Sequence, residues 1–445
     1  MKKKYKDQNV LILGLGINQG GLGATRFFAE QEAHVRVTDL KDETMLADSL
    51  DQLKKYSNIE YILGEHRFQD IDWADLVIRN PALKPDNTFR KYAEESGKRV
   101  EMDMGIFLEY IKRENVIGIT GTKGKSTTSS LIYYILKEAG KDVIFAGNIG
   151  KSILDSVPYL QRDTLAVLEL SSFMLEAWEQ HNVSPHLAVV TNIFPDHLDY
   201  YGDMQSYIEA KKVIAKYQTD ADVLFVPEVN PLMDAHEFVA GIQTPVETFS
   251  AKDIPDDMEF LLLGEHNKAN FAAAMHVTRH LGISEKEALH IMQTFKGVEF
   301  RMQLIKDVDG IKIYNDTAAT GPDSAEHSLR AFPHPILITG GVNKGLPYEQ
   351  YARAIDTLAR SVYFIEGSAT DELKRLMREK VKIKGSWDNF DELLAEVHKE
   401  AESGDTILFS PGGSSFNLFQ NEFDRGRKFN EAVNRIFNNE VDANK

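Results

Sequence analysis

Short apolar segments alternate along the chain with longer stretches whose apolar residues recur at helical spacing. The short segments are rich in β-branched residues, and glycines or turn residues usually follow them before the helical stretch begins. This alternation is typical of an α/β fold in which most strands are parallel and buried. The strands predicted in this way are Val10–Leu13, Val35–Thr38, Leu76–Ile78, Val116–Thr120, Val143–Phe145, Leu165–Leu170, Leu187–Thr191, Ile311–Tyr314, Ile336–Thr339, Val362–Ile365 and Ile407–Ser410.

The alternation restarts twice along the sequence. One restart lies near Glu114 and Asn115, and the other lies between Gly297 and Arg301, ahead of a new run of strands. A chain of 445 residues is also too long for one hydrophobic core of ordinary size. We therefore predict three domains with boundaries near residues 112 and 298.

Composition narrows the classes of protein that remain. With 42% hydrophobic and 27% charged residues, and no apolar run of about 18 residues, a membrane span is not expected. The net charge of -17 disfavours broad nucleic-acid binding. The absence of cysteine excludes a disulfide framework, a thiolate nucleophile and a cysteine zinc site, and is compatible with a reducing compartment. No export signal is visible, so we expect a cytoplasmic monomer without nucleic-acid or membrane partners.

The most specific segment is a glycine-rich phosphate loop between a predicted strand and a helix expected from about Ser126 to Ala139. It reads Gly-Ile-Thr-Gly-Thr-Lys-Gly-Lys-Ser-Thr over residues 118–127. Glycines let backbone N–H groups surround phosphate oxygens, and the helix dipole favours the anion. Lys125 can then reach the β- and γ-phosphates, while Ser126 or Thr127 can ligate Mg²⁺. The strict Walker pattern has glycine where this chain has Ile119.

Two polar residues follow strands predicted beside this loop. Glu169 stands near the end of Leu165–Leu170, and His197 comes shortly after Leu187–Thr191. The carboxylate of Glu169, at the end of a strand beside the loop, is well placed for Mg²⁺. Because the carboxyl ends of parallel strands share one edge of a sheet, His197 is expected at the same edge. An ordinary strand-end acid and a structural histidine are the alternatives.

The N-terminal segment has the pattern of a second nucleotide site. After the first strand come Gly14, Gly16 and Gly20, then a helix, then a strand that ends at Asp39. The glycines suit a pyrophosphate at a helix N-terminus, and the acid suits a ribose. A dinucleotide and a nucleotide-diphosphate sugar both carry a diphosphate that such a site can bind, so the pattern fits either ligand. A nicotinamide-dependent oxidoreductase is therefore one alternative.

The offset of the glycines in the phosphate loop resembles that of the Mur ligase and folylpolyglutamate synthase superfamily. Glu-Leu-Ser-Ser-Phe at 169–173 and Thr-Asn-Ile-x-x-Asp-His-Leu-Asp at 191–199 are similar to further Mur ligase motifs. The resemblance spans nearly the whole chain. It implies an α/β fold with three domains: a Rossmann-like N-terminal domain that binds a UDP substrate over 1–112, a central P-loop ATPase domain over 113–298, and a Rossmann-like C-terminal domain that binds an amino acid over 299–445.

The same resemblance implies the residues that handle ATP and two Mg²⁺ ions. Lys211 lies in a segment similar to the one that carries the family's carbamylated lysine, and as a carbamate it would support a metal. The alternatives are that Lys212 is the carbamylated residue, or that both are ordinary solvated lysines of a helix. The implied catalytic residues are Lys125, Glu169, His197 and Lys211, and the implied metal ligands are Ser126, Glu169, His197 and Lys211. The implied ATP contacts are Gly121, Thr122, Lys123, Gly124, Lys125, Ser126, Thr127, Asn267, Asn270, Arg301 and Asp316. Helix capping is the alternative for the two asparagines.

Substrate contacts are implied in both terminal thirds. Gly16, Asn18, Gln19, Gly20, Asp39 and Lys41 would face the UDP group, and Asn148 would face the muramyl part. The C-terminal segments are most similar to the D-glutamate-adding branch, in which Thr320, Lys344, Ser415 and Phe423 would bind the glutamate. The chain departs from the pattern at Phe300, Ala318 and Asn417, and Val77–Ala82 replaces a Ser-Pro-Gly-Ile segment.

The activity implied by the resemblance is ATP-dependent addition of D-glutamate to UDP-N-acetylmuramoyl-L-alanine through an acyl phosphate. A folylpolyglutamate synthase would lack the extra N-terminal domain, and other muramyl ligases usually carry Asp-Tyr-Ala-His where this chain has residues 315–318. A non-catalytic nucleotide-binding regulator is disfavoured by the joint presence of Lys125, Glu169 and His197. D- and L-glutamate both remain open as the added amino acid.

Overall fold

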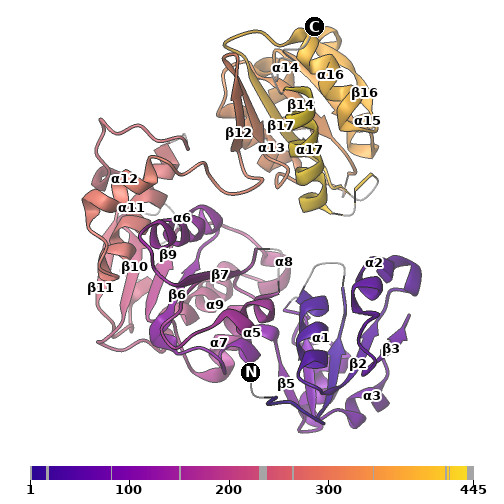
Figure 1. The fold of residues 1–445 in the computed structure, drawn as a ribbon, viewed down its shortest axis with the longest axis vertical. Coiled ribbons are helices and arrows are strands. Elements are labelled where there is room, and N and C mark those ends of the chain that lie inside the picture. Colours follow the sequence, from indigo (N-terminus) through magenta and orange to yellow (C-terminus); the bar gives the residue numbers. More distant parts are fainter. Residues whose placement is uncertain are drawn as a thin grey trace, which may run out of the picture. The chain divides into compact units, whose positions relative to one another are not determined.

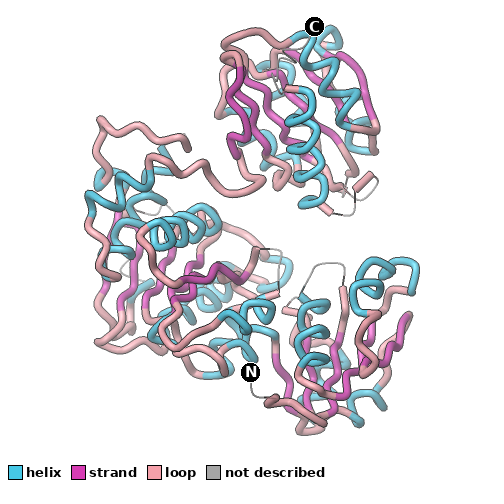
Figure 2. Tube along the Cα trace, in the orientation of Figure 1, coloured by secondary structure: helices cyan, strands magenta, loops and turns pink. Residues whose placement is uncertain are grey.

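Three separate β-sheets follow one another along the chain, each flanked by helices (Figures 1 and 2). The computed structural model describes residues 3–16, 20–81, 83–149, 152–229, 238–262, 265–343, 345–415, 418–419 and 421–437. Within these residues, no helix combines the length and apolar character needed to cross a membrane.

The first sheet is fully parallel, with the strand order β3-β2-β1-β4-β5. Its order reverses between β1 and β4, so the carboxyl ends of these two strands form the topological switch point where open α/β sheets bind ligands. The strands are β1 (Asn9–Leu13), β2 (His34–Asp39), β3 (Ile59–Leu63), β4 (Leu76–Arg79) and β5 (Arg99–Glu101). The helices are α1 (Gly20–Glu30), α2 (Glu43–Leu53), α3 (Phe68–Trp73), α4 (Thr88–Glu95) and α5 (Asp103–Phe107).

The second sheet is also parallel, in the order β11-β10-β9-β6-β8-β7, and places the phosphate-loop strand β6 between β8 and β9. Its strands are β6 (Val116–Thr120), β7 (Val143–Gly147), β8 (Leu165–Glu169), β9 (Leu187–Val190), β10 (Val223–Pro227) and β11 (Val246–Phe249). The helices are α6 (Lys125–Glu138), α7 (Leu175–His181), α8 (Leu198–Tyr201), α9 (Met204–Lys216), α11 (Glu265–His280) and α12 (Glu285–Met292). Short 3₁₀ helices cover Arg113–Asn115, Ile153–Tyr159 and Ala251–Asp253.

The third sheet has the order β12-β13-β17-β14-β15-β16, and only its edge pair β12–β13 is antiparallel among the described strands. Its apolar residues form two cores, one shared with α13, α14 and α15 and the other with α16 and α17. The strands are β12 (Gln303–Val308), β13 (Ile311–Asn315), β14 (Ile336–Gly340), β15 (Ser361–Ile365), β16 (Ile383–Trp387) and β17 (Thr406–Gly412). The helices are α13 (Pro322–Arg330), α14 (Glu349–Leu358), α15 (Ser368–Leu376), α16 (Phe390–Glu400) and α17 (Glu422–Ile436), with a 3₁₀ turn at Lys380–Lys382.

The predicted strands all appear in these sheets, with ends that shift by a residue or two. The strands that the hydrophobic pattern did not reveal lie mostly at sheet edges. β3, β11 and β16 are edge strands with partly exposed residues, and β5 spans only Arg99–Glu101. Edge strands need fewer apolar residues because one side and often one face meet water.

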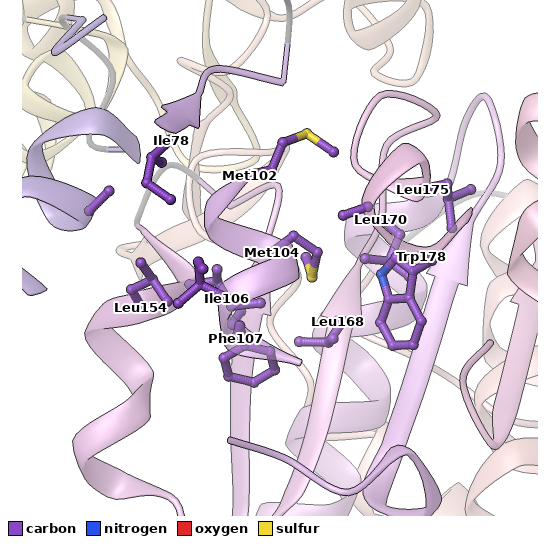
Figure 3. Close-up of a cluster of buried hydrophobic side chains, with 14 of the residues drawn as sticks. Ile78, Met102, Met104, Ile106, Phe107, Leu154, Leu168, Leu170, Leu175 and Trp178 are labelled. Atoms are coloured by element: carbon purple, nitrogen blue, oxygen red, sulfur yellow. The ribbon is translucent and has the colours of Figure 1, made fainter. Parts of the chain in front are cut away.

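The chain forms two compact units, of which one comprises Met1–Met258 and Glu265–Met292 and the other Glu259–Gly264 and Gln293–Lys445. The first unit joins the first two sheets through one continuous apolar core. Figure 3 shows this core, where Met104 and Phe107 of α5 lie among Leu154, Leu168 and Trp178. The N-terminal sheet is therefore packed firmly on the domain that carries the phosphate loop.

A close approach between α1 and Ser152 in this contact predicts a sensitive position. A Cβ atom added at Gly23 of α1 would lie 2.1 Å from Ser152 Cβ. Gly23→Ala should therefore lower the free energy of unfolding by about 1–3 kcal/mol through overpacking, although alanine normally favours a helix. Thermal unfolding is the measurement. The double variant Gly23→Ala/Ser152→Gly should recover most of the loss, and a stabilising Gly23→Ala would contradict the predicted contact.

Candidate active site

The phosphate loop follows β6 directly and ends in the first turn of α6. Two of its glycines adopt positive φ, +141° at Gly121 and +80° at Gly124. A side chain at Gly121 would also meet Thr191 Oγ1 at 2.0 Å, and one at Gly124 would meet Asn270 Oδ1 at 2.6 Å. Both conformation and space thus require glycine, and the loop delivers the N-terminus of a helix of 14 residues.

The segment after β9 holds the phosphate loop in place. Thr122 N–H donates to the Asn192 carbonyl at 2.9 Å, and Lys123 N–H donates to Asn192 Oδ1 at 2.8 Å. Thr191 Oγ1 donates to the Lys123 carbonyl at 2.5 Å. The Thr-Asn motif recognised in the sequence therefore fixes the loop through its own backbone and side chains.

Helix α9 adds two side chains one turn apart. The hydroxyl groups of Tyr207 and Thr122 lie 3.1 Å apart, and Lys211 Nζ donates to the Gly121 carbonyl at 3.0 Å. Both residues are almost fully buried, with Lys211 only 2% exposed. The i, i+4 spacing on one helix face accounts for their common contact with the loop.

Two lysines meet at the Gly121 carbonyl. Lys125 Nζ donates to the carbonyls of Gly121 and Thr122 at 2.8 and 2.9 Å, beside the Lys211 contact. Burial, reinforced by the positive charge of Lys125, lowers the pKa of Lys211 to about 7, against a smaller opposing effect of Asp196. A substantial fraction of Lys211 is therefore a neutral amine at neutral pH.

Glu169 lies at the end of β8, next to the loop strand, with Ile119 as its register partner. It is 1% exposed, and its Oε2 atom has no hydrogen-bond partner in the described part of the chain, while Oε1 accepts from Asn148 Nδ2 at 3.2 Å. A buried carboxylate oxygen without a donor fits a cation ligand, because a cation would satisfy it. Within the described residues no group of three His, Cys, Asp or Glu side chains is arranged to hold a metal ion.

His197 lies at the same edge of the second sheet, in the segment after β9. It caps α8 with left-handed backbone at φ +53°, and its side chain is 45% exposed. Its ring packs edge-on against Phe173 at 5.0 Å between centroids. His197 is thus held by the aromatic residue of the Glu-Leu-Ser-Ser-Phe motif, with its ring still open to water.

Asn267 and Asn270 are buried within α11 rather than before its first residue. Thr128 Oγ1 donates to Asn270 Oδ1 at 3.2 Å, and Asn270 Nδ2 donates to Asn267 Oδ1 at 3.1 Å. These bonds join α11 to α6 beside Gly124. The two asparagines implied as ATP contacts therefore lie against the phosphate loop, and neither of them is the N-cap of α11.

Arg301 and Asp316 belong to the second compact unit and lie close together there. Arg301 is exposed between two residues with positive φ, Phe300 at +66° and Met302 at +42°. Asp316 is buried and accepts from Met302 N–H at 3.1 Å and Ser410 Oγ at 2.7 Å. Burial raises the pKa of Asp316 to about 6, against the opposing effect of these donors and of Arg301.

The segments predicted to bind glutamate follow three adjacent strands, β13, β17 and β14. Gly412 N–H donates to the Ala319 carbonyl at 2.8 Å, next to Thr320, and Ser414 pairs with Val342. Ser415 is buried, and Phe423 of α17 lies 6.1 Å from Phe300 between ring centroids. Thr320 and Ser415 thus come from neighbouring loops, while Lys344 lies outside the described residues.

The predicted UDP contacts cluster after β1 and β2. Asp39 is buried and accepts from the backbone N–H groups of Gly16 at 2.8 Å and Lys41 at 2.9 Å. The carboxylate therefore ties the glycine loop to the end of β2. Gly20 starts α1, and Asn18 and Gln19 lie outside the described residues.

Three residues at these sites were not assigned a role from the sequence. Thr191 and Tyr207 contact the phosphate loop directly, and the helical spacing between Tyr207 and Lys211 is the signal that could have found one of them. Arg425 of α17 is buried and donates to the carbonyls of Gly413 and Thr317 and to Thr317 Oγ1. Burial lowers its pKa to about 9. Arg425 meets the Gly413 loop only in the folded chain, so no local sequence pattern identifies it.

Family models match the chain in three segments. They are the Mur ligase MurD-like N-terminal domain at residues 8–101, the Mur ligase middle domain at 119–259 and the Mur ligase glutamate ligase domain at 300–413. Curated relatives named UDP-N-acetylmuramoylalanine--D-glutamate ligase include one from Roseiflexus sp. (strain RS-1), 37% identical over 96% of this chain and 98% of the relative. Another, from Borreliella burgdorferi, is 34% identical over 97% of this chain and 99% of the relative. The chain belongs to the Mur ligase family.

Solved structures show the same fold. UDP-N-acetylmuramate-alanine ligase from Thermotoga maritima matches with a TM-score of 0.58 at 21% identity, covering 96% of this chain and 99% of that one. The MurF ligase from Thermotoga maritima in complex with ADP matches with a TM-score of 0.53 at 15% identity, covering 98% and 96%. The predicted fold class, α/β with three domains, is confirmed.

The environment of Lys211 predicts a pH-dependent stability. Its pKa is about 7 in the folded chain and 10.5 when unperturbed, so between these values the unfolded chain binds the extra proton. Stability due to this group therefore rises with pH across that window. Relative to Lys211→Met, the wild type should gain on the order of 1–3 kcal/mol from pH 7 to pH 9. Denaturant unfolding in metal-free buffer without carbon dioxide measures it; a constant difference would contradict the lowered pKa.

Proposed function

We propose that the chain is an ATP-dependent ligase that adds D-glutamate to UDP-N-acetylmuramoyl-L-alanine in the cytoplasm. The observation that carries the ligase assignment is the meeting of Lys125, Lys211 and the phosphate loop beside the unpartnered oxygen of Glu169. The substrates are those in the names of the relatives that match nearly the whole chain. The three predicted segments, 1–112, 113–298 and 299–445, would bind the UDP substrate, ATP and the amino acid, in a monomer.

ATP would bind with its phosphates at the loop and the N-terminus of α6. The first turn of α6, Lys125 to Thr127, would supply backbone N–H groups and the positive end of the helix dipole. Lys125 would turn from its carbonyl acceptors to the β- and γ-phosphates. One structural relative, the MurF ligase from Thermotoga maritima, was solved in complex with ADP.

Mg²⁺ would be held by Ser126, Glu169, His197 and a carbamate on Lys211, and when bound it would neutralise phosphate charge. The low pKa of Lys211 supports the carbamate, since the neutral amine attacks carbon dioxide. The new N–C bond gives a carbamate anion and releases one proton. The group, neutral as the amine, then carries a negative charge that attracts Lys125.

The reaction proposed at this site has two chemical steps. The carboxylate of the muramyl substrate attacks the γ-phosphorus of ATP, and ADP leaves as an acyl phosphate forms. The amine of glutamate then attacks the acyl carbon, loses a proton and expels inorganic phosphate. Lys125 stabilises the phosphoryl transfer by charge, and Asn148, which donates to Glu169, would orient the muramyl substrate close to the loop.

The ligase assignment predicts a strict dependence of ATP turnover on both substrates. Phosphate release should require UDP-N-acetylmuramoyl-L-alanine and D-glutamate together, because the acyl phosphate completes turnover only with an amine acceptor. A coupled phosphate assay and mass measurement of the product test it. A panel of D- and L-amino acids serves as the control for the acceptor. Hydrolysis that ignores both substrates would overturn the proposal, whereas preference for another amino acid would overturn only D-glutamate.

The carbamate proposed on Lys211 can be tested by replacing the lysine and restoring activity with short carboxylates. Lys211→Ala should lose at least about 100-fold in kcat, since a metal ligand is removed, and short carboxylates should partly restore the rate. Lys212→Ala is the matched control: Lys212 lies next to it on α9 but pairs with Glu209 at 3.3 Å. Its kcat should stay within about threefold of the wild type. Full activity of Lys211→Ala, or a loss in Lys212→Ala alone, would contradict the assignment.

A further inference from the structure

Arg79 ends β4 at the switch point of the first sheet, directly beside the end of β1. Its register partner in β1 is Leu13, after which the glycine loop begins. Arg79, Asp103 and the glycines Gly14, Gly20 and Gly21 line a cavity of about 30 Å³ at this point. The cavity therefore lies where open parallel sheets bind phosphorylated ligands.

The Arg79 guanidinium is buried but only partly paired. Its side chain is 1% exposed, and Nη2 donates to Glu176 Oε1 of α7 at 2.8 Å. The Nη1 atom is buried without a hydrogen-bond partner among the described residues. A buried N–H group without an acceptor is unfavourable, and arginine remains charged at neutral pH. Arg79, which lines the cavity, thus keeps one buried, charged donor that has no acceptor among the described residues.

The surroundings favour a phosphate oxygen as that acceptor. The cavity also reaches Gly20 and Gly21 in the first turn of α1, a helix of 11 residues whose N-terminus attracts anions. Among the described residues that line it, Asp103 is the one acidic side chain, and its carboxylate already accepts from the neighbouring Met104 N–H at 2.8 Å. The cavity has room for an oxygen atom but not for a sugar or a base.

We propose that Arg79 Nη1 binds a phosphate oxygen of the diphosphate in the UDP-linked substrate. This inference rests on the proposed function and adds a residue in the Val77–Ala82 segment, which departs from the Ser-Pro-Gly-Ile pattern of the family. Glu176 positions the guanidinium through Nη2 and leaves Nη1 for the ligand. Because Glu176 belongs to α7, the bound diphosphate is linked through Arg79 to the domain that carries Glu169.

The test compares the affinities for UDP and uridine, which differ by the diphosphate. Arg79→Gln should weaken UDP binding roughly 10- to 100-fold, the effect of a charge-assisted hydrogen bond, and leave uridine binding unchanged. Arg90→Gln is the matched control. Arg90 also binds Glu176, but its other donors are occupied by Glu94 at 2.9 Å and the Leu83 carbonyl at 3.1 Å. Its ratio of UDP to uridine affinity should match the wild type.

A purely structural role for Arg79 makes a different prediction. If Nη1 meets only a buried water, Arg79→Gln would lower the melting temperature and leave the UDP-to-uridine ratio unchanged, which overturns the inference. An equal fall of the ratio in Arg90→Gln would overturn it as well. If Arg79→Gln fails to fold, Arg79→Lys replaces it: one ammonium lacks the fork that serves Glu176 and phosphate together, so the ratio should still fall.

The same titrations separate this inference from the proposed function. A wild-type chain that binds neither UDP nor UDP-N-acetylmuramoyl-L-alanine contradicts the proposed substrate. A wild-type chain that ligates, with a ratio insensitive to Arg79, contradicts only the role of Arg79. In the ligase assay, Arg79→Gln should raise KM for the muramyl substrate and keep kcat within about threefold, since Arg79 acts on binding.

Discussion

Two lysine ammonium groups and one peptide carbonyl meet at the centre of the phosphate-loop domain. Lys125 and Lys211 both donate to Gly121, and the loop around them is fixed by Thr191, Asn192 and Tyr207. Burial of Lys211, together with repulsion from the charge of Lys125, lowers the pKa of Lys211 to about 7. Glycine at 121, the position of α9 and the chemistry proposed for Lys211 all depend on this meeting.

The N-terminal sheet is connected to that centre by packing and by charge. Gly23 of α1 abuts Ser152, while Arg79 and Arg90 both pair with Glu176 at the start of α7. The segment just before α7 carries Glu169 and Phe173, and Phe173 supports the ring of His197. A change at the UDP end of the first sheet can therefore reach the proposed metal ligands through a few rigid contacts.

In the second compact unit, buried charged groups with fixed partners also lie at the carboxyl ends of the strands. Loops after β13, β14 and β17 meet there, and the buried guanidinium of Arg425 donates to backbone carbonyls of the Thr317 and Gly413 loops. Asp316 is buried nearby and satisfied by Ser410 and Met302. Buried charges of this kind require fixed partners, which explains why these loops are ordered by side chains rather than by regular structure.

The sequence by itself determined the α/β class, the phosphate loop, the family and most of the central strands, although the buried strand β10 was missed. These features are local: strand periodicity, glycine spacing and short motifs are readable because neighbouring residues produce them. Edge strands such as β3 and β16 were missed because partial exposure weakens that pattern.

Only the tertiary structure decided which side chains meet. Asn148 joins Glu169, Asn270 meets Thr128, and Arg79 is left with one unpartnered donor, although no periodicity links these residues. The lowered pKa of Lys211 likewise comes from burial and from Lys125, 86 positions earlier in the printed sequence. Desolvation and charge act through space, so they appear only once the chain has folded.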